Sequence, residues 1–123
     1  QIAQIMNVMR QRNPVVMATR ISPDVYQLLQ PKVRELRYYE MARICAITPD
    51  TIEPKYHGEI GIISAGTADL PIAEEAAVTA ELCGFRVQRL WDVGVAGIHR
   101  LLNNRHVIES ASVLIVVAGM EGA

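Results

Sequence analysis

Three short apolar segments in the second half of the chain have the pattern of strands in a parallel sheet. They are residues 59–64, 85–90 and 112–117, and the first is almost continuously apolar, as expected for a strand covered on both faces. Segments with helical spacing lie between them. This alternation predicts an α/β fold in which helices connect parallel strands by right-handed crossovers.

The connecting segments carry the signals of helices. Alanine recurs through residues 72–83, proline precedes this stretch, and Gly84 stands where a helix usually ends. The small side chains would let this helix pack closely on the sheet or on another helix. Glu74 and Glu75, near its start, suit the positive end of the helix dipole. Residues 98–110 predict a second, shorter helix.

The first half of the chain predicts a small α/β region. Residues 1–12 predict a helix, residues 15–19 a short strand, and Ser22 caps a helix that ends before Pro31. Residues 35–48 fit either a strand with a helical start or the reverse. The polar residues 49–58, with two prolines, predict a linker. We therefore expect an N-terminal region over residues 1–54 and the first part of a second domain over residues 55–123.

Composition narrows the classes of function. Twelve basic and 13 acidic residues give a net charge of −1, which offers no general attraction to nucleic acid or anionic membranes. No apolar run approaches the roughly 18 residues of a spanning helix, and no signal peptide is visible. Cys45 and Cys83 do not have the spacing of a metal site, and two cysteines are too few for a disulfide scaffold. We therefore expect both to be reduced and packed, in a cytoplasmic protein. The chain opens without methionine and stops after a strand, which suggests a fragment.

The turns that follow the three strands form the candidate functional site. Open α/β sheets bind ligands at the carboxyl ends of their strands, so residues 65–69, 92–97 and 118–122 should meet there. The first turn is the best phosphate site, because a small-residue loop before a helix presents unpaired amides, although a purely structural turn remains an alternative. The candidate substrate-binding residues are Ser64, Gly66, Thr67, Ala68, Asp69, Asp92, Gly94, Gly97 and Gly119.

Glu121 is the most informative single residue. It has little packing value in its glycine-flanked turn, and a semi-enclosed site would raise its pKa towards general acid or base catalysis. A solvated loop glutamate is the alternative reading. Asp69 could instead cap a helix and Asp92 could shape a turn. His99 begins a helix, where surface histidine is common, and no partner stands at metal-ligand spacing, so no metal site is predicted.

Four motifs in the second half of the chain resemble those of one enzyme family, the nickel-pincer cofactor biosynthesis carboxylase/hydrolases. They are Ser64-Ala-Gly-Thr-Ala-Asp-Leu-Pro71, Glu74-Glu-Ala-Ala-Val-Thr79, Asp92-Val-Gly-Val-Ala-Gly-Ile-His-Arg100 and Val117-Ala-Gly-Met-Glu-Gly-Ala123. Ala18-Thr-Arg20, Ser22-Pro and Glu35-Leu-Arg-Tyr38 look like the family's N-terminal region. The family belongs to the aminoimidazole ribonucleotide carboxylase superfamily, and cyanobacterial members have been called circadian phase modifiers.

The resemblance implies a fold and a reaction. The fold is a flavodoxin-like three-layer domain with a PurE-like core, truncated here after its third strand. The family carboxylates the pyridinium ring of nicotinic acid adenine dinucleotide with CO2 or bicarbonate and hydrolyses its phosphoanhydride, which gives pyridinium-3,5-biscarboxylic acid mononucleotide and AMP. Mg2+ is implied, with no tightly bound cofactor. A cysteine adds to the ring and a glutamate removes the ring proton. Glu121 matches that glutamate, whereas the cysteine would lie beyond Ala123, so we expect the fragment alone to be inactive.

One departure from the family pattern keeps alternatives open. Ala68 stands where members often carry serine in a Thr-Ser-Asp triplet, although Thr67 and Asp69 remain. A non-catalytic regulatory protein that keeps the fold is therefore one alternative. An aminoimidazole ribonucleotide carboxylase or mutase is another, but its serine- and aspartate-rich first loop and its histidine after the third strand are not seen. The resemblance also implies a homo-oligomer, for which the helix over residues 72–83 offers a close-packing surface, and no nucleic acid or membrane partner.

Overall fold

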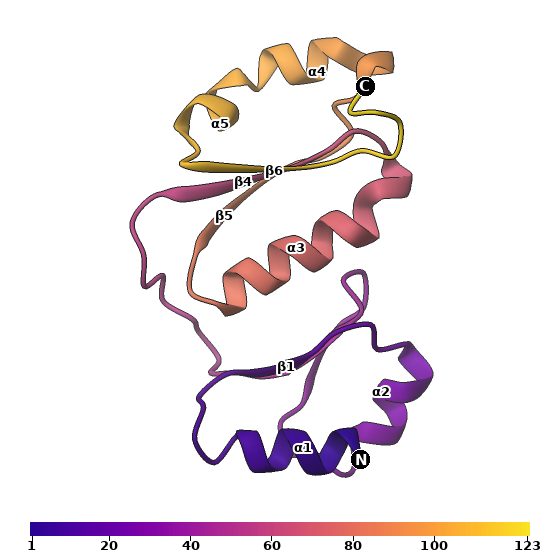
Figure 1. Cartoon of the computed structure of the whole chain (residues 1–123), viewed down its shortest axis with the longest axis vertical. Coiled ribbons are helices and arrows are strands. Elements are labelled where there is room, and N and C mark those ends of the chain that lie inside the picture. The colour runs from indigo at the N-terminus through magenta and orange to yellow at the C-terminus, as the bar shows by residue number, and fades with distance from the viewer.

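The computed structural model describes residues 1–123 as a stack of alternating helical and sheet layers (Figure 1). From the N-terminal end, two helices cover an antiparallel sheet, a long helix separates that sheet from a parallel one, and two short helices cover the far face. The two sheets and their helices form an N-terminal and a second unit. None of the helices has the length and apolar character needed to cross a membrane.

The N-terminal unit contains the predicted helix, strand and capped helix. These are α1 (Ile2–Met9), β1 (Val16–Ala18) and α2 (Pro23–Leu29), and the Ser22 hydroxyl accepts a hydrogen bond from the Val25 amide at 3.3 Å. Both helices lie on one face of a sheet of order β1-β3-β2. The sequence therefore located these elements correctly.

Residues 35–48, which the sequence left open, form two strands and no helix. They are β2 (Arg37–Tyr39) and β3 (Ile44–Ile47), paired antiparallel so that Tyr38 lies opposite Cys45. All four residues of β3 are buried, because helices cover both faces of this central strand. Burial on both faces makes the run uniformly apolar and so hides the alternation by which a strand is usually recognised.

The second unit is built on a parallel sheet of order β5-β4-β6. Its strands are β4 (Glu59–Ser64), β5 (Arg86–Leu90) and β6 (Val113–Val117). The single turn η1 (Thr67–Asp69) and α3 (Leu70–Leu82) connect the first two strands. The single turn η2 (Val95–Gly97), α4 (Ile98–Asn103) and α5 (Arg105–Ser110) return on the other face to β6. This α/β arrangement is compatible with a flavodoxin-like fold.

Two features of this unit differ from the predictions. The single helix expected over residues 98–110 is broken at Asn104, whose side chain donates to the Arg100 carbonyl at 2.7 Å. Strand β6, expected to be buried, is an edge strand, and Val113 and Val116 are 54% and 58% exposed.

Helix α3 contributes to the cores of both units. Ala73 and Ala77 pack against Ile62 of the parallel sheet, which confirms the close packing predicted from the alanines. On another face of the helix, Val78 and Leu82 join a cluster with Ala42, Ile44 and Ala46 from the N-terminal unit. A cluster of buried side chains thus crosses the boundary placed near residue 54. A role for α3 in oligomer formation stays a prediction.

The two cysteines lie in different surroundings, and neither forms a disulfide. Cys45 is fully buried in β3, and burial raises the pKa of its thiol. Cys83 is exposed directly after α3. The expectation of a packed cysteine is therefore right for Cys45 and wrong for Cys83.

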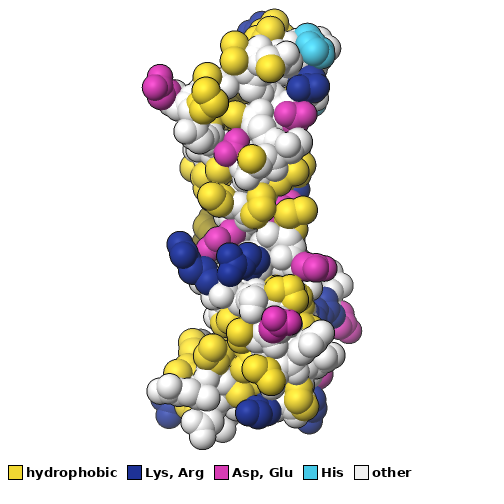
Figure 2. Space-filling model, turned by 90° about the vertical axis from the view of Figure 1, so that its right-hand side faces the viewer, with side chains coloured by type: hydrophobic (Ala, Val, Ile, Leu, Met, Phe, Trp, Pro, Cys, Tyr) yellow, Lys and Arg dark blue, Asp and Glu magenta, His cyan; other side chains and the backbone are white.

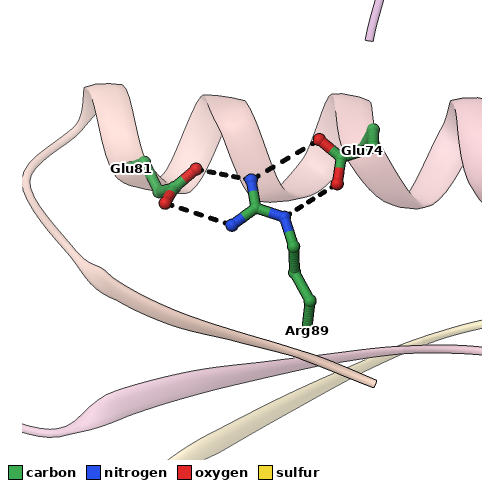
Figure 3. Close-up of polar contacts among 3 residues, drawn as sticks. All are labelled: Glu74, Glu81 and Arg89. Carbon is green, nitrogen blue, oxygen red and sulfur yellow. Dashed lines mark hydrogen bonds and ion pairs between the residues drawn. The ribbon is translucent and has the colours of Figure 1, made fainter. Parts of the chain in front are cut away.

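An arginine on the parallel sheet joins α3 to β5 (Figure 3). The Arg89 guanidinium contacts Glu74 at 2.7 Å and Glu81 at 2.6 Å, and all three side chains are less than half exposed. The hydrogen bond with Glu81, followed by that with Glu74, raises the pKa of Arg89. Glu74, which the sequence assigned to the helix dipole, is primarily an ion-pair partner.

Replacing Arg89 with methionine should lower the free energy of unfolding by about 1–2 kcal/mol, because two carboxylates lose charge-assisted hydrogen bonds. Urea denaturation measures the change. Arg105→Met is the matched control, since Arg105 pairs with Glu109 across one exposed helical turn at 3.1 Å and should contribute less than about 0.5 kcal/mol. Equal losses of unfolding free energy in the two variants would contradict a stabilising role for the Arg89 ion pairs between α3 and β5.

Candidate functional site

The three turns meet at the carboxyl edge of the parallel sheet, as the sequence predicted. The Gly94 amide donates to the Ala65 carbonyl at 2.8 Å, which joins the second turn to the first. The Val95 amide donates to the Ala123 carbonyl at 3.2 Å, and the Ala65 amide donates to the Val117 carbonyl at 3.1 Å. Direct backbone hydrogen bonds thus link the first two turns to each other and to the residues on either side of the third turn. Figure 2 looks onto this side of the molecule and shows apolar and acidic side chains there, with basic side chains at the waist below.

Gly94 is required by this convergence. A Cβ at this position would lie 2.6 Å from the Ala65 carbonyl oxygen and 3.3 Å from that of Ala123. Both neighbours are backbone atoms, which cannot rotate away as a flexible side chain could. A side chain at position 94 would therefore push the three turns apart.

The first turn offers free backbone donors to a ligand. The Asp69 carboxylate accepts a hydrogen bond from the Gly66 amide at 2.9 Å and so holds the loop in shape, the capping role considered for it from the sequence. The amides of Thr67 and Ala68, at the start of η1, have no acceptor in the chain, and both residues are exposed. This arrangement suits an anion at the N-terminal end of α3.

Ser64 lies at the same edge but is fully buried. Its hydroxyl accepts the Asp92 amide at 3.2 Å, so it faces the second turn. A contact between Ser64 and substrate stays a prediction. The geometry assigns Ser64 a structural task that the sequence did not indicate.

The second turn is held by Arg100, which sequence reasoning did not single out. Its Nε donates to the Asp92 carbonyl at 2.6 Å, and its guanidinium lies 3.4 Å from the Asp92 carboxylate. Asp92 has a φ of 58°, in the left-handed region. The guanidinium also occupies the space that a Cβ at Gly97 would need. The available signal was an arginine three residues after glycine at the start of a helix.

Glu121 lies in the third turn with its side chain exposed. It has a φ of 57° and no hydrogen-bond or ion-pair partner. The enclosure expected around it is not formed by the described residues, because β6 is an edge strand. Its neighbours Gly122 and Ala123 line a largely apolar pocket of about 410 Å3 beneath α4 and α5. A catalytic role for Glu121 stays a prediction, as does a binding role for Gly119, which lies near Asp69.

The residues of the site do not form a resident metal centre. No three histidine, cysteine, aspartate or glutamate side chains are grouped closely enough to hold an ion. Asp69 contacts the Gly66 amide and Asp92 contacts Arg100, while His99 is exposed. The Mg2+ implied by the resemblance stays a prediction.

Comparison with known proteins finds a family model that matches most of the N-terminal unit. Residues 1–49 match the family described as LarB/PurE-like N-terminal domain. An uncharacterized protein from Methanocaldococcus jannaschii is 39% identical over 122 aligned residues, which cover 92% of this chain and 47% of that protein. The chain thus spans about half the length of this curated relative. Together with the α/β fold, the family match supports a place for this chain in the PurE/LarB superfamily.

Proposed function

We propose that the full-length protein carboxylates the pyridinium ring of nicotinic acid adenine dinucleotide and hydrolyses its phosphoanhydride to release AMP. The observation that carries this proposal is the hydrogen-bonded meeting of three turns, which puts free amides and a carboxylate at one sheet edge. The match of residues 1–49 to a LarB/PurE-like domain supports a carboxylase of this superfamily. A homo-oligomer is part of the proposal.

The chemistry divides between binding and proton transfer. The Thr67 and Ala68 amides bind a phosphate of the substrate, aided by the dipole of the 13-residue α3. A cysteine from outside residues 1–123 adds to the cationic ring, and the resulting electron-rich ring carbon attacks CO2. Glu121 removes the proton from that carbon, and departure of the cysteine restores the aromatic ring. Water cleaves the phosphoanhydride.

The alanine at position 68 does not remove the proposed phosphate site. The backbone amide is present whatever the side chain, and only the hydroxyl that relatives often supply is missing. Thr67 is exposed beside it and can supply a hydroxyl. We therefore propose that substrate binding is retained, with one hydrogen bond fewer.

The test is incubation of full-length protein with nicotinic acid adenine dinucleotide, 13C-bicarbonate and Mg2+. We expect AMP together with a mononucleotide that carries the label. Absence of both products contradicts the proposal. Saturable binding of the dinucleotide without turnover would instead favour the regulatory alternative, and turnover of aminoimidazole ribonucleotide would favour the purine-pathway alternative.

A further inference from the structure

A second pocket lies between the two units, away from the three turns. Its volume is about 480 Å3, and its walls come from β2, residues 48–54, the second half of α3 and the start of β5. Small-molecule sites commonly have volumes of roughly 300–1,000 Å3 and often lie between structural units. The predicted linker therefore forms one wall of a pocket.

This linker is fixed at both ends. At its start, Asp50 pairs with Arg37 of β2 at 2.5 Å. At its end, the Lys55 amide donates to the Gly84 carbonyl at 2.7 Å, and the Tyr56 and Phe85 rings stack with centroids 4.5 Å apart. The wall is thus held over the pocket by contacts with both units. The pocket is preformed, so a ligand would not have to order this segment.

The lining combines an apolar floor with one arginine that has no carboxylate partner. Val78 and Leu82 are buried beneath it, and the aromatic rings of Tyr39 and Phe85 line its sides. Among the charged lining residues, Asp50 pairs with Arg37 and Glu81 pairs with Arg89. Arg86 alone has no carboxylate partner and is exposed. Since Glu74 and Glu81 share Arg89, the pocket as a whole carries no excess positive charge, but the Arg86 guanidinium is left free to pair with an anion.

We propose that this pocket binds a small aromatic molecule that carries one anionic group. The flat body packs between the aromatic rings and the aliphatic floor, and the anion pairs with the free Arg86 guanidinium. A carboxylate and a phosphate ester share this chemistry, since guanidinium binds both through two parallel hydrogen bonds. The site is independent of the carboxylation proposed above.

Calorimetric titration of full-length protein with benzoate and with phenyl phosphate tests the proposal, with benzamide as a neutral ligand of similar shape. We expect at least one anion to bind saturably, and benzamide to bind about tenfold more weakly. The stronger of the two anions identifies the chemical class. Lack of saturable binding by both anions, or equal binding of benzamide, would overturn the proposal.

Substitutions test whether the anion binds in this pocket. Arg86→Gln should weaken the anion about tenfold, and Arg86→Lys should restore most of the affinity because it keeps the charge. Arg105→Gln, a change of the same type on exposed α5, and Glu121→Gln, at the three turns, should leave the affinity unchanged. An unaltered affinity in Arg86→Gln, or a loss in Glu121→Gln, would place the ligand elsewhere.

Discussion

Replacing Glu121 with glutamine should lower the rate of label incorporation from bicarbonate by roughly 10²–10⁴-fold, the usual contribution of a positioned general base. Glutamine keeps the size of the side chain but cannot accept the ring proton. Since the Glu121 side chain is exposed and makes no hydrogen bond or ion pair, the fold should be unaffected. The measurement is kcat and KM of full-length protein with 13C-bicarbonate, and we expect the loss in kcat.

Glu53→Gln is the matched control for this variant. Glu53 is another exposed glutamate without a partner, but it lies in the linker, away from the sheet edge. Its replacement should leave kcat and KM unchanged. A Glu121→Gln protein with the wild-type rate would show that another group removes the ring proton, even if carboxylation itself occurs.

Replacing Leu82 with alanine should lower the free energy of unfolding by about 2–5 kcal/mol, the range for a buried leucine that leaves a cavity. Leu82 is 6% exposed and packs with Ile44 and Ala46 of the N-terminal unit. The loss should reach both units, because α3 belongs to both cores. Urea denaturation gives its size, and amide hydrogen exchange in β3 and β4 shows whether both sheets lose protection.

Ile72→Ala is the control on the same helix. Ile72 is 62% exposed, so its truncation should change stability by no more than about 0.5 kcal/mol. If Leu82→Ala lowered protection in β3 alone, the two units would unfold separately. Equal effects of the two substitutions would contradict the shared core.

Much of the fold follows from the sequence because local signals and tertiary packing agree. The Ser22 cap, the proline in the first turn of α3 and Gly84 after this helix mark the helix ends where the structure has them. Most failures occur where tertiary contacts decide. Residues 35–48 carry no readable period, because β3 is buried on both faces. The break at Asn104 accompanies a local contact, the side-chain hydrogen bond to the Arg100 carbonyl, which the helical spacing of residues 98–110 did not indicate. The exposure of β6 depends on neighbours in space that no local pattern encodes.

The site was predictable in its location but not in its contacts. The topology of parallel strands requires the three turns to share one edge, and they do. Sequence reasoning could not show that the Ser64 hydroxyl faces Asp92, or that Arg100 holds the second turn, since both contacts join residues that the local pattern does not pair. The sequence did not predict the pocket near Arg86, because the composition of residues 49–58 indicates only a linker.

The backbone conformation at Glu121 has a consequence for stability. Its φ of 57° lies in the left-handed region, which glycine adopts without strain. Any other residue there lowers the stability of the fold by roughly 1 kcal/mol or more. Glycine would be the thermodynamically favoured residue at this position, as at neighbouring Gly122, whose φ is 80°. A glutamate in this conformation lowers the stability of the fold. A screen that selects only heat-resistant variants would therefore be expected to replace Glu121.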